Sequence, residues 1–246
     1  GHGRDYAWSA TTATSDNVDT FAEVLCRDNF HYLHRGKCKP MEKLEKTESW
    51  TPNAIDSTEA GSQTLTAYRT VHGIVFARGK VGGRKVAFAH QRSTYFHEAD
   101  SVIGFAQLNE PGFLTDASRF KEAVSHINFL FNWSYVDDRN IALFSSGRLP
   151  IRALDVASGL PTDGTGAHEW SGFEPLAAHA RGVNPPSGTI LNWNNKPALG
   201  FSASDDNWGF GPVQRVQLLQ AQVAKRKVHT LASLAGAMNA AATQDL

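Results

Sequence analysis

Three asparagines surround a tryptophan in residues 191–197, directly after the apolar residue Ile190. Asparagine is poorly suited to the interior of a strand, and a buried side-chain amide must find hydrogen-bond partners. At the end of a strand, such amides can donate to a negative charge that develops during a reaction. The same residues also suit an ordinary turn, in which Asn side chains bond their own backbone. The spacing alone leaves both interpretations open.

Acidic residues are placed where they could bind a hard cation. Asp16 and Asp19 lie close together near the start of the chain, and Asp205 lies in a polar stretch far along it. Carboxylate and loop-carbonyl oxygens are the ligands that calcium prefers. The spacing is not that of a twelve-residue EF-hand loop, and a solvated acidic turn at residues 16–19 would use the same residues.

The chain contains two cysteines, Cys26 and Cys38. The residues between them predict a short strand and a tight turn, with Gly36 supplying a positive φ. Such a hairpin can bring the two sulfur atoms within bridging distance, which favours a disulfide and an extracytoplasmic location. Two reduced thiols in the cytosol are the alternative. His31 and His34 diverge in a hairpin, and we expect both to be solvated.

The charge and hydrophobicity of the chain restrict the kinds of binding partner that it can have. The 246 residues carry 24 basic and 24 acidic side chains, so no net field attracts the chain to nucleic acid or to an anionic membrane. No run approaches the roughly 18 apolar residues of a membrane span. The chain opens without the charged and apolar start of a signal peptide. It also begins without Met, so we expect a processed product or a fragment.

Hydrophobic periodicity predicts a mixture of strands and helices in one domain that covers residues 1–246. The expected strands cover residues 6–12, 21–25, 41–50, 64–71, 74–78, 85–89, 129–136, 141–144 and 189–193. The expected helices cover residues 99–108, 117–127, 213–221 and 228–242, with Asp116 as an N-cap for the second. Residues 145–187 form a long, ordered excursion rich in Gly, Pro and Ser. This order of elements is typical of an α+β architecture of antiparallel strands with flanking helices.

The ordered set of short motifs resembles the central part of the β chain of the penicillin acylase (penicillin amidase) family, which belongs to the N-terminal nucleophile hydrolases. The matching segments are Gly1-His2 with Ala7-Trp8; Asp16-Asn17-Val18-Asp19 with Phe21-Ala22-Glu23; Arg69-Thr70-Val71-His72-Gly73; Asn132-Trp133 with Asp137; Gly164-Thr165-Gly166 with Trp170; Asn184-Pro185-Pro186-Ser187-Gly188; Asn192-Trp193-Asn194-Asn195-Lys196-Pro197; and Arg215-Val216. The resemblance covers essentially the whole chain. It implies an αββα sandwich of two antiparallel sheets, incomplete in this chain.

The resemblance also implies cleavage of an amide between an acyl group and an amine. In the family an N-terminal Ser attacks and its own α-amine is the base. Residue 1 is Gly, so we expect the nucleophile upstream of this segment. The oxyanion hole maps to the side chain of Asn194 and the backbone N–H of Thr12, where the family often has a small apolar residue. Arg215 matches an orienting arginine, and Phe131 aligns near the acyl pocket, although ordinary core packing would also explain it.

A structural calcium site is implied in the same way. Asp16, Asp19 and Asp205 match family ligands, Val18 supplies a carbonyl, and a further carbonyl maps near Ser158, where the family has Pro. Another ligand comes from the family's α chain.

Two classes of function follow. In the first, the chain is part of a bacterial, secreted or periplasmic hydrolase that also needs an α chain and the remainder of the β chain. Its small-molecule substrate is an acyl amide such as a β-lactam, a lipopeptide or an acyl-homoserine lactone. In the second, the chain is a non-catalytic fragment or binding module. An upstream segment that begins with Ser, Thr or Cys after processing would favour the first.

Overall fold

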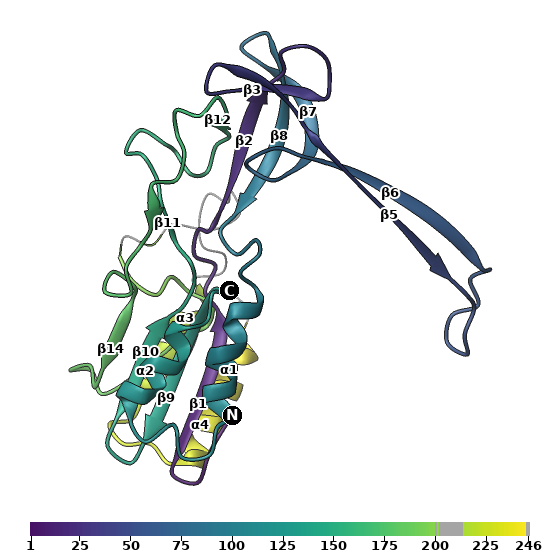
Figure 1. Cartoon of the computed structure of the whole chain (residues 1–246). Helices are drawn as coiled ribbons and strands as arrows, with labels where there is room; N and C mark the ends of the chain where they lie inside the picture. Colours follow the sequence, from purple (N-terminus) through teal and green to yellow (C-terminus); the bar gives the residue numbers. More distant parts are fainter. Residues whose placement is uncertain (200, 202–213, 245–246) are drawn as a thin grey trace. The chain divides into compact units, whose positions relative to one another are not determined.

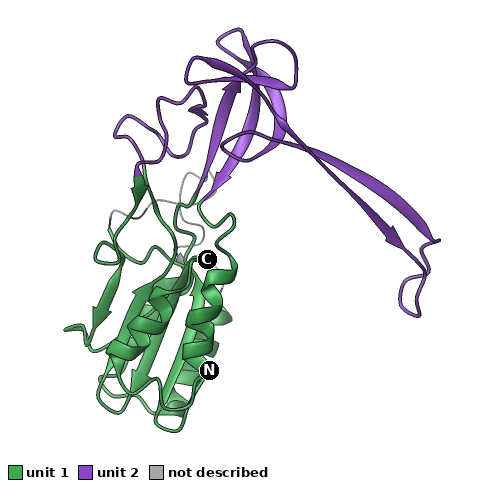
Figure 2. Ribbon diagram, in the orientation of Figure 1, with its two compact units in different colours: residues 1–17, 93–151, 172–246 green, residues 18–92, 152–171 purple. Residues whose placement is uncertain are grey.

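A computed structural model of the chain describes residues 1–199, 201 and 214–244. The chain divides into two compact units (Figure 2). The first unit contains residues 1–17, 93–151 and 172–246, and the second contains residues 18–92 and 152–171. A single domain over residues 1–246 stays a prediction. None of the described helices is long and apolar enough to span a membrane.

The first unit is built on an antiparallel sheet in the order β1-β9-β10-β14 (Figure 1). Its strands are β1 (Tyr6–Thr12), β9 (Phe131–Asp137), β10 (Ile141–Ser145) and β14 (Arg181–Val183), with a separate pair, β11 (Pro150–Ile151) and β13 (Gly172–Phe173). Its helices are the 3-10 turn η1 (Ala99–Ser101), α1 (Val102–Asn109), α2 (Ala117–Ser125), α3 (Gln214–Val223) and α4 (Leu231–Ala242).

Alternating aromatic residues of β9 form the core of the first unit against α2. Trp133 and Tyr135 are almost completely buried and pack in one cluster with Phe120 of α2. Because side chains on a strand alternate between faces, this cluster marks one face of the sheet as the side covered by α1 and α2 (Figure 1). Asp116 caps α2 by accepting the backbone N–H groups of Ser118 and Arg119, as predicted.

The second unit is a six-stranded sheet in the order β12-β2-β8-β7-β6-β5 with a separate hairpin. The sheet strands are β2 (Val18–Val24), β5 (Glu42–Trp50), β6 (Gly61–Arg69), β7 (Ile74–Val81), β8 (Arg84–Arg92) and β12 (Thr162–Asp163), and the hairpin is β3 (His31–His34) with β4 (Lys37–Pro40). Only the short pairing of β12 with β2 is parallel. The turn between β7 and β8 has positive φ at Gly82 and Gly83, which confirms the predicted hairpin.

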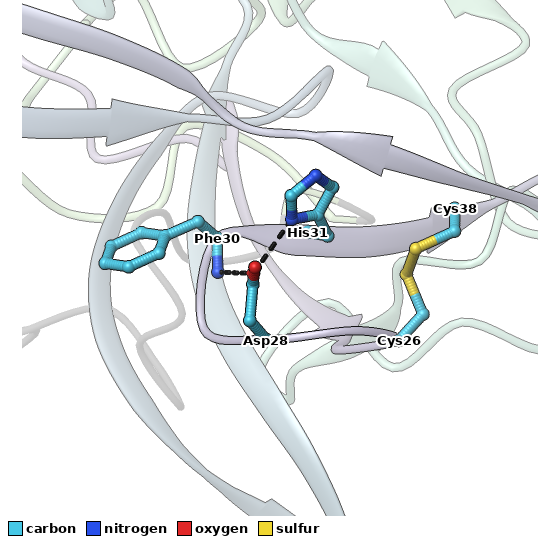
Figure 3. Close-up of a disulfide and its surroundings, with 5 residues drawn as sticks. All are labelled: Cys26, Asp28, Phe30, His31 and Cys38. Carbon is cyan, nitrogen blue, oxygen red and sulfur yellow. Dashed lines mark hydrogen bonds and ion pairs between the residues drawn. A yellow bond between two sulfur atoms is a disulfide. The ribbon is translucent and has the colours of Figure 1, made fainter.

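The predicted disulfide is present. Cys26 and Cys38 are joined across 12 positions beside the β3–β4 hairpin (Figure 3), and the turn has positive φ at Gly36. His31 bonds the carboxylate of Asp28, with 2.8 Å between Nδ1 and Oδ1 (Figure 3). The expectation that both hairpin histidines are solvated is wrong for His34, which is 5% exposed.

The α+β class is confirmed, and three local predictions need correction. Residues 189–193 form no strand, and the Trp193 N–H donates to the side chain of Asn195 rather than to a sheet partner. The acidic segment 16–19 is not wholly a turn, since β2 already begins at Val18. Residues 145–187 contain four short strands, β11 to β14, within the predicted excursion.

Candidate functional site

The end of β1 presents backbone groups at an open sheet edge. Ala13 N–H donates to the carbonyl of Leu130, 3.0 Å away, and consecutive N–H groups of a strand point to opposite sides. Because β1 is the edge strand of its sheet, the N–H and C=O of Thr12 point away from β9. Thr12 is exposed. The structure therefore leaves this N–H on the free side of the strand.

The side chain of Asn194 lies at this edge. Its Nδ2 donates to the Thr12 carbonyl across 3.1 Å. The backbone of Asn194 adopts a left-handed conformation with φ of 61°, which asparagine tolerates better than most residues. Its backbone N–H donates to Asn192 Oδ1 at 3.0 Å, and the Thr11 hydroxyl donates to the same oxygen at 2.6 Å. The asparagine turn is thereby tied to β1 rather than left in solvent.

Arg215 on α3 fixes the orientation of that amide. Its Nη2 lies 3.3 Å from Asn194 Oδ1 and 3.5 Å from the carbonyl of Trp193. The guanidinium carbon is 5.5 Å from the centroid of the Trp193 ring, within cation–π range. Since the amide oxygen accepts from Arg215, the amide nitrogen faces Thr12.

This edge can bind a developing oxyanion. Asn194 has a second amide N–H besides the one that bonds Thr12, and the Thr12 N–H points to the same side of β1. Two neutral donors held by the fold are the standard requirement for stabilising a tetrahedral intermediate. The Thr11 hydroxyl donates to an amide oxygen, which is not a base, so this contact does not activate it as a nucleophile.

Phe131 lies opposite Thr12 in the pairing of β1 with β9. Its ring packs edge-on against Trp133, 5.3 Å between centroids, on the face of the sheet that α1 and α2 cover. A cavity of 160 Å³ lies among side chains that include Ser9, Thr11 and Asn192 but not Phe131. The structure thus places Phe131 beside the end of β1 while its side chain joins the core cluster.

The predicted calcium ligands are divided between the units. Asp16 is buried in the first unit, whereas Val18, Asp19 and Ser158 belong to the second. Asp205 lies outside the described residues.

Asp19 is the most buried of these carboxylates, at 2% exposure. Arg152 Nε lies 3.0 and 2.8 Å from its two oxygens, and Trp170 Nε1 also donates to Oδ2. The carboxylates of Asp16 and Asp19 have the hard oxygen chemistry that calcium requires. At Asp19 a metal ion would have to share or displace the guanidinium of Arg152.

Sequence reasoning missed one set of polar residues. His34, His72 and Glu169 come together in the second unit, and Glu23 supports them from a fully buried position. Glu169 is 135 positions from His34, so no local pattern joins them. The signal that could have found His34 is its spacing of two from Tyr32 in a short strand, which places both side chains on one face, and the structure buries both.

Comparison with known proteins agrees with this fold. A family model described as penicillin amidase matches residues 1–245. This α+β chain belongs to the penicillin amidase family.

Individual relatives and one solved structure are similar to this chain over most of its length. The chain is 30% identical over 207 residues to penicillin G acylase of Escherichia coli, covering 83% of this chain and 23% of that protein. It is 26% identical over 197 residues to the acyl-homoserine lactone acylase QuiP of Pseudomonas fluorescens, covering 77% of this chain and 23% of that protein. The structure of a thermostable penicillin G acylase from Alcaligenes faecalis superposes with a TM-score of 0.83 and 26% identity, over 96% of this chain and 41% of the other. The chain therefore spans about a quarter of the length of these curated relatives.

Proposed function

We propose that this chain is the part of an acyl-amide hydrolase that supplies the oxyanion-binding groups. The contact between Asn194 Nδ2 and the Thr12 carbonyl, at 3.1 Å, is the observation that carries the proposal. It places a neutral side-chain donor beside a backbone N–H at an open strand edge. Relatives named as penicillin G acylase and acyl-homoserine lactone acylase support the same reaction, hydrolysis of an amide between an acyl group and an amine.

The nucleophile lies outside this chain in this proposal. An N-terminal Ser attacks the amide carbonyl carbon, and its own α-amine accepts the hydroxyl proton. The carbonyl oxygen becomes negative and accepts hydrogen bonds from Thr12 N–H and Asn194 Nδ2. The amine then leaves with a proton, and water hydrolyses the acyl–serine ester. Arg215 acts as a positioning residue, because it touches the amide oxygen of Asn194 and the backbone of Trp193.

The sandwich architecture is part of the same proposal. Helices α1 and α2 cover one face of the sheet in the first unit. Beside that sheet lies a cavity of 580 Å³ whose lining includes Ser134 and Val136 of β9 and Val228 and Leu234 near α4. A cavity of this size accommodates a few side chains and not a sheet. In the proposal, the second of the two face-to-face sheets comes from strands outside this chain.

A structural calcium ion is proposed from the chemistry of the donors. Asp16, Asp19 and the carbonyl of Val18 would hold it, with Asp205, Ser158 and a ligand from an α chain. Calcium would balance the charge of the buried carboxylates there and would take no part in the reaction. Removing calcium with EGTA should lower the melting temperature of the full-length protein, and Asp19→Asn should abolish that dependence. An unchanged dependence in Asp19→Asn would contradict the site.

The compartment and the substrate class follow the relatives. The Cys26–Cys38 disulfide supports an oxidising location, secreted or periplasmic, in a bacterium. The substrate is a small acyl amide, and the likeness to QuiP makes acyl-homoserine lactones a second candidate beside β-lactams. Lipopeptides are a third. Because one methylene changes discrimination only modestly, chain length must be tested directly.

The test is made on the full-length protein. Mass spectrometry of its chain termini should find a chain that begins with Ser, and replacement of that Ser by Ala should abolish activity. A panel of chromogenic acyl anilides, from arylacetyl to long-chain fatty acyl, then measures kcat/KM. Hydrolysis of at least one anilide supports the proposal. A correctly processed protein that hydrolyses none of them, nor an acyl-homoserine lactone, contradicts it.

A further inference from the structure

Two histidines and a glutamate of the second unit meet at one point. His34 ends β3, His72 lies in the turn between β6 and β7, and Glu169 follows β12 along the chain. Glu169 Oε1 lies 2.9 Å from His34 Nε2 and 3.2 Å from His72 Nε2. The three ligand atoms all lie within 4.8 Å of one another. Both imidazoles therefore direct the same nitrogen at one carboxylate oxygen.

A second layer holds the ring of His72. Its Nδ1 lies 2.7 Å from Glu23 Oε1, and its face stacks on Phe21 with centroids 3.8 Å apart. Glu23 is completely buried, and its other oxygen has no hydrogen-bond partner among the residues that the structure describes. A side chain at Gly164 would collide with the Glu23 carboxylate, so the glycine makes room for it.

The hydrogen bond to Glu23 determines whether His72 Nε2 carries a proton or a lone pair where it faces Glu169. An ionised carboxylate only accepts, so His72 Nδ1–H donates to Glu23 and the proton of a neutral ring is used there. The lone pair of Nε2 then faces a carboxylate oxygen at 3.2 Å. Two such lone pairs repel unless a positive charge lies between them. A proton or a metal ion can supply it.

We propose that His34, His72 and Glu169 form a binding site for a divalent transition metal ion, with Zn²⁺ as its probe. Imidazole nitrogens with one carboxylate are a common ligand set for zinc. Glu23 takes the outer position that fixes a histidine ligand and increases its basicity. The two carboxylates balance the charge of one divalent ion. Nitrogen ligands separate this site from the proposed calcium site, which offers oxygen alone.

The partial exposure of Glu169 determines how easily a bound metal ion could exchange with solution. Its side chain is 27% exposed, whereas the side chains of His34 and His72 are 6% and 1% exposed. Water can therefore reach the fourth position of a tetrahedral ion from the Glu169 side. The metal should exchange with solution and be removable by a chelator without unfolding.

Lys39 should weaken metal binding at His34, so replacing it gives the most specific test of the site. Its Nζ lies 3.1 Å from His34 Nδ1, and an ammonium group there favours the tautomer that keeps the proton on Nε2. Metal binding at Nε2 moves that proton to Nδ1, where it faces Lys39. Replacing Lys39 by Gln removes the charge and supplies an oxygen that can accept from Nδ1–H. We therefore expect tighter Zn²⁺ binding in Lys39→Gln.

The experiment is isothermal titration of Zn²⁺ into the chelator-treated full-length protein, with calcium present in excess. We expect one saturable site. His34→Gln and Glu169→Gln should each weaken it at least tenfold, and Glu23→Gln about 10- to 100-fold. Lys39→Gln should strengthen it. His31→Gln is the matched control, since His31 lies on the same hairpin but bonds Asp28 (Figure 3), and its affinity should equal that of the wild type.

The outcomes separate a metal site from an ion-paired network. Wild-type protein without saturable Zn²⁺ binding, or equal affinity in the wild type, His34→Gln and Glu169→Gln, would overturn the proposal. If a ligand variant fails to fold, Co²⁺ loaded into the wild type and Lys39→Gln decides the question. Tetrahedral Co²⁺ gives visible absorption bands. Bands that saturate at a lower Co²⁺ concentration in Lys39→Gln than in the wild type support the site, and the absence of such bands from both proteins overturns it. The experiment measures metal binding and not hydrolysis, so its outcome is independent of the proposed acylase function.

Discussion

At the free edge of β1 the donors are neutral amides beside an exposed strand end, whereas in the second unit the polar groups are charged and buried. Arg215 holds the side-chain amide of Asn194 in one orientation. One N–H of that amide bonds the Thr12 carbonyl, and the other is left for a ligand. His72 and Glu23 bond each other, with side chains 1% and 0% exposed. The first arrangement leaves donors open to a transient negative charge, and the second pairs its buried polar groups with one another. Removing a residue should therefore cost reaction rate at the first and stability at the second.

The largest stability effect should follow from Glu23→Ala. Removing one partner of a buried charge pair leaves the other uncompensated, which costs about 3–5 kcal/mol. Hydrogen exchange of the β2 and β8 amides, measured in a chelator, should show their opening free energy falling by this amount. Glu45→Ala removes an exposed partner of Lys43 and is the control. Equal protection of β2 in the two variants would show that the cluster is not a stabilising network.

The next effect should be catalytic. Arg215→Ala removes a hydrogen bond from a charged group to the Asn194 amide, worth roughly 1.5–3 kcal/mol, so kcat should fall about 10- to 100-fold. KM should change little, because the contact acts through the transition state. Adding Arg215→Ala to Asn194→Ala should cost almost nothing more. Full additivity of the two losses would assign Arg215 a purely structural role, and Arg119→Ala, an exposed partner of Glu122, is the control.

A smaller effect concerns pH and α2. The backbone N–H groups of Arg119 and Ser118 hold the pKa of Asp116 below its usual value of 3.8. A lowered folded pKa means that the cap stabilises the helix above pH 3.8 and loses this effect as the pH falls through the folded pKa. The protection factors of the α2 amides, which correct for the pH dependence of intrinsic exchange, should therefore fall below pH 3.8 in the wild type. Asp116→Asn keeps a good cap without a titrating group, so a fall in protection that persists in this variant would contradict the assignment.

Much of the first unit could be predicted from the sequence, because its elements follow local rules. The alternation of β9 and the cap at Asp116 each appear in a few consecutive residues. Residues 189–193 were predicted as a strand because Ile190, Leu191 and Trp193 are apolar. The competing interaction, Asn195 Oδ1 accepting the Trp193 N–H at 2.9 Å, is the local asparagine–backbone bond that the same segment also allowed, and the sequence alone did not decide between the two.

The two sites differ in how far sequence could find them. The pairing of Thr12 with Asn194 joins residues 182 positions apart, and only the family resemblance predicted it. The cluster around Glu169 joins three separate loops and strands of the second unit, and neither spacing nor resemblance indicated it. Long-range contacts of this kind follow from the topology of the sheet, which periodicity alone does not fix.

The most direct test of the central claim is single-turnover acylation by the full-length protein carrying Asn194→Ala. The acylation rate should fall about 10²- to 10³-fold, as removal of an oxyanion donor does, with little change in substrate affinity. Thr12→Ala should match the wild type because the backbone donates, and Asn109→Ala on the surface of α1 should do the same. An Asn194→Ala protein that acylates at the wild-type rate would contradict the account.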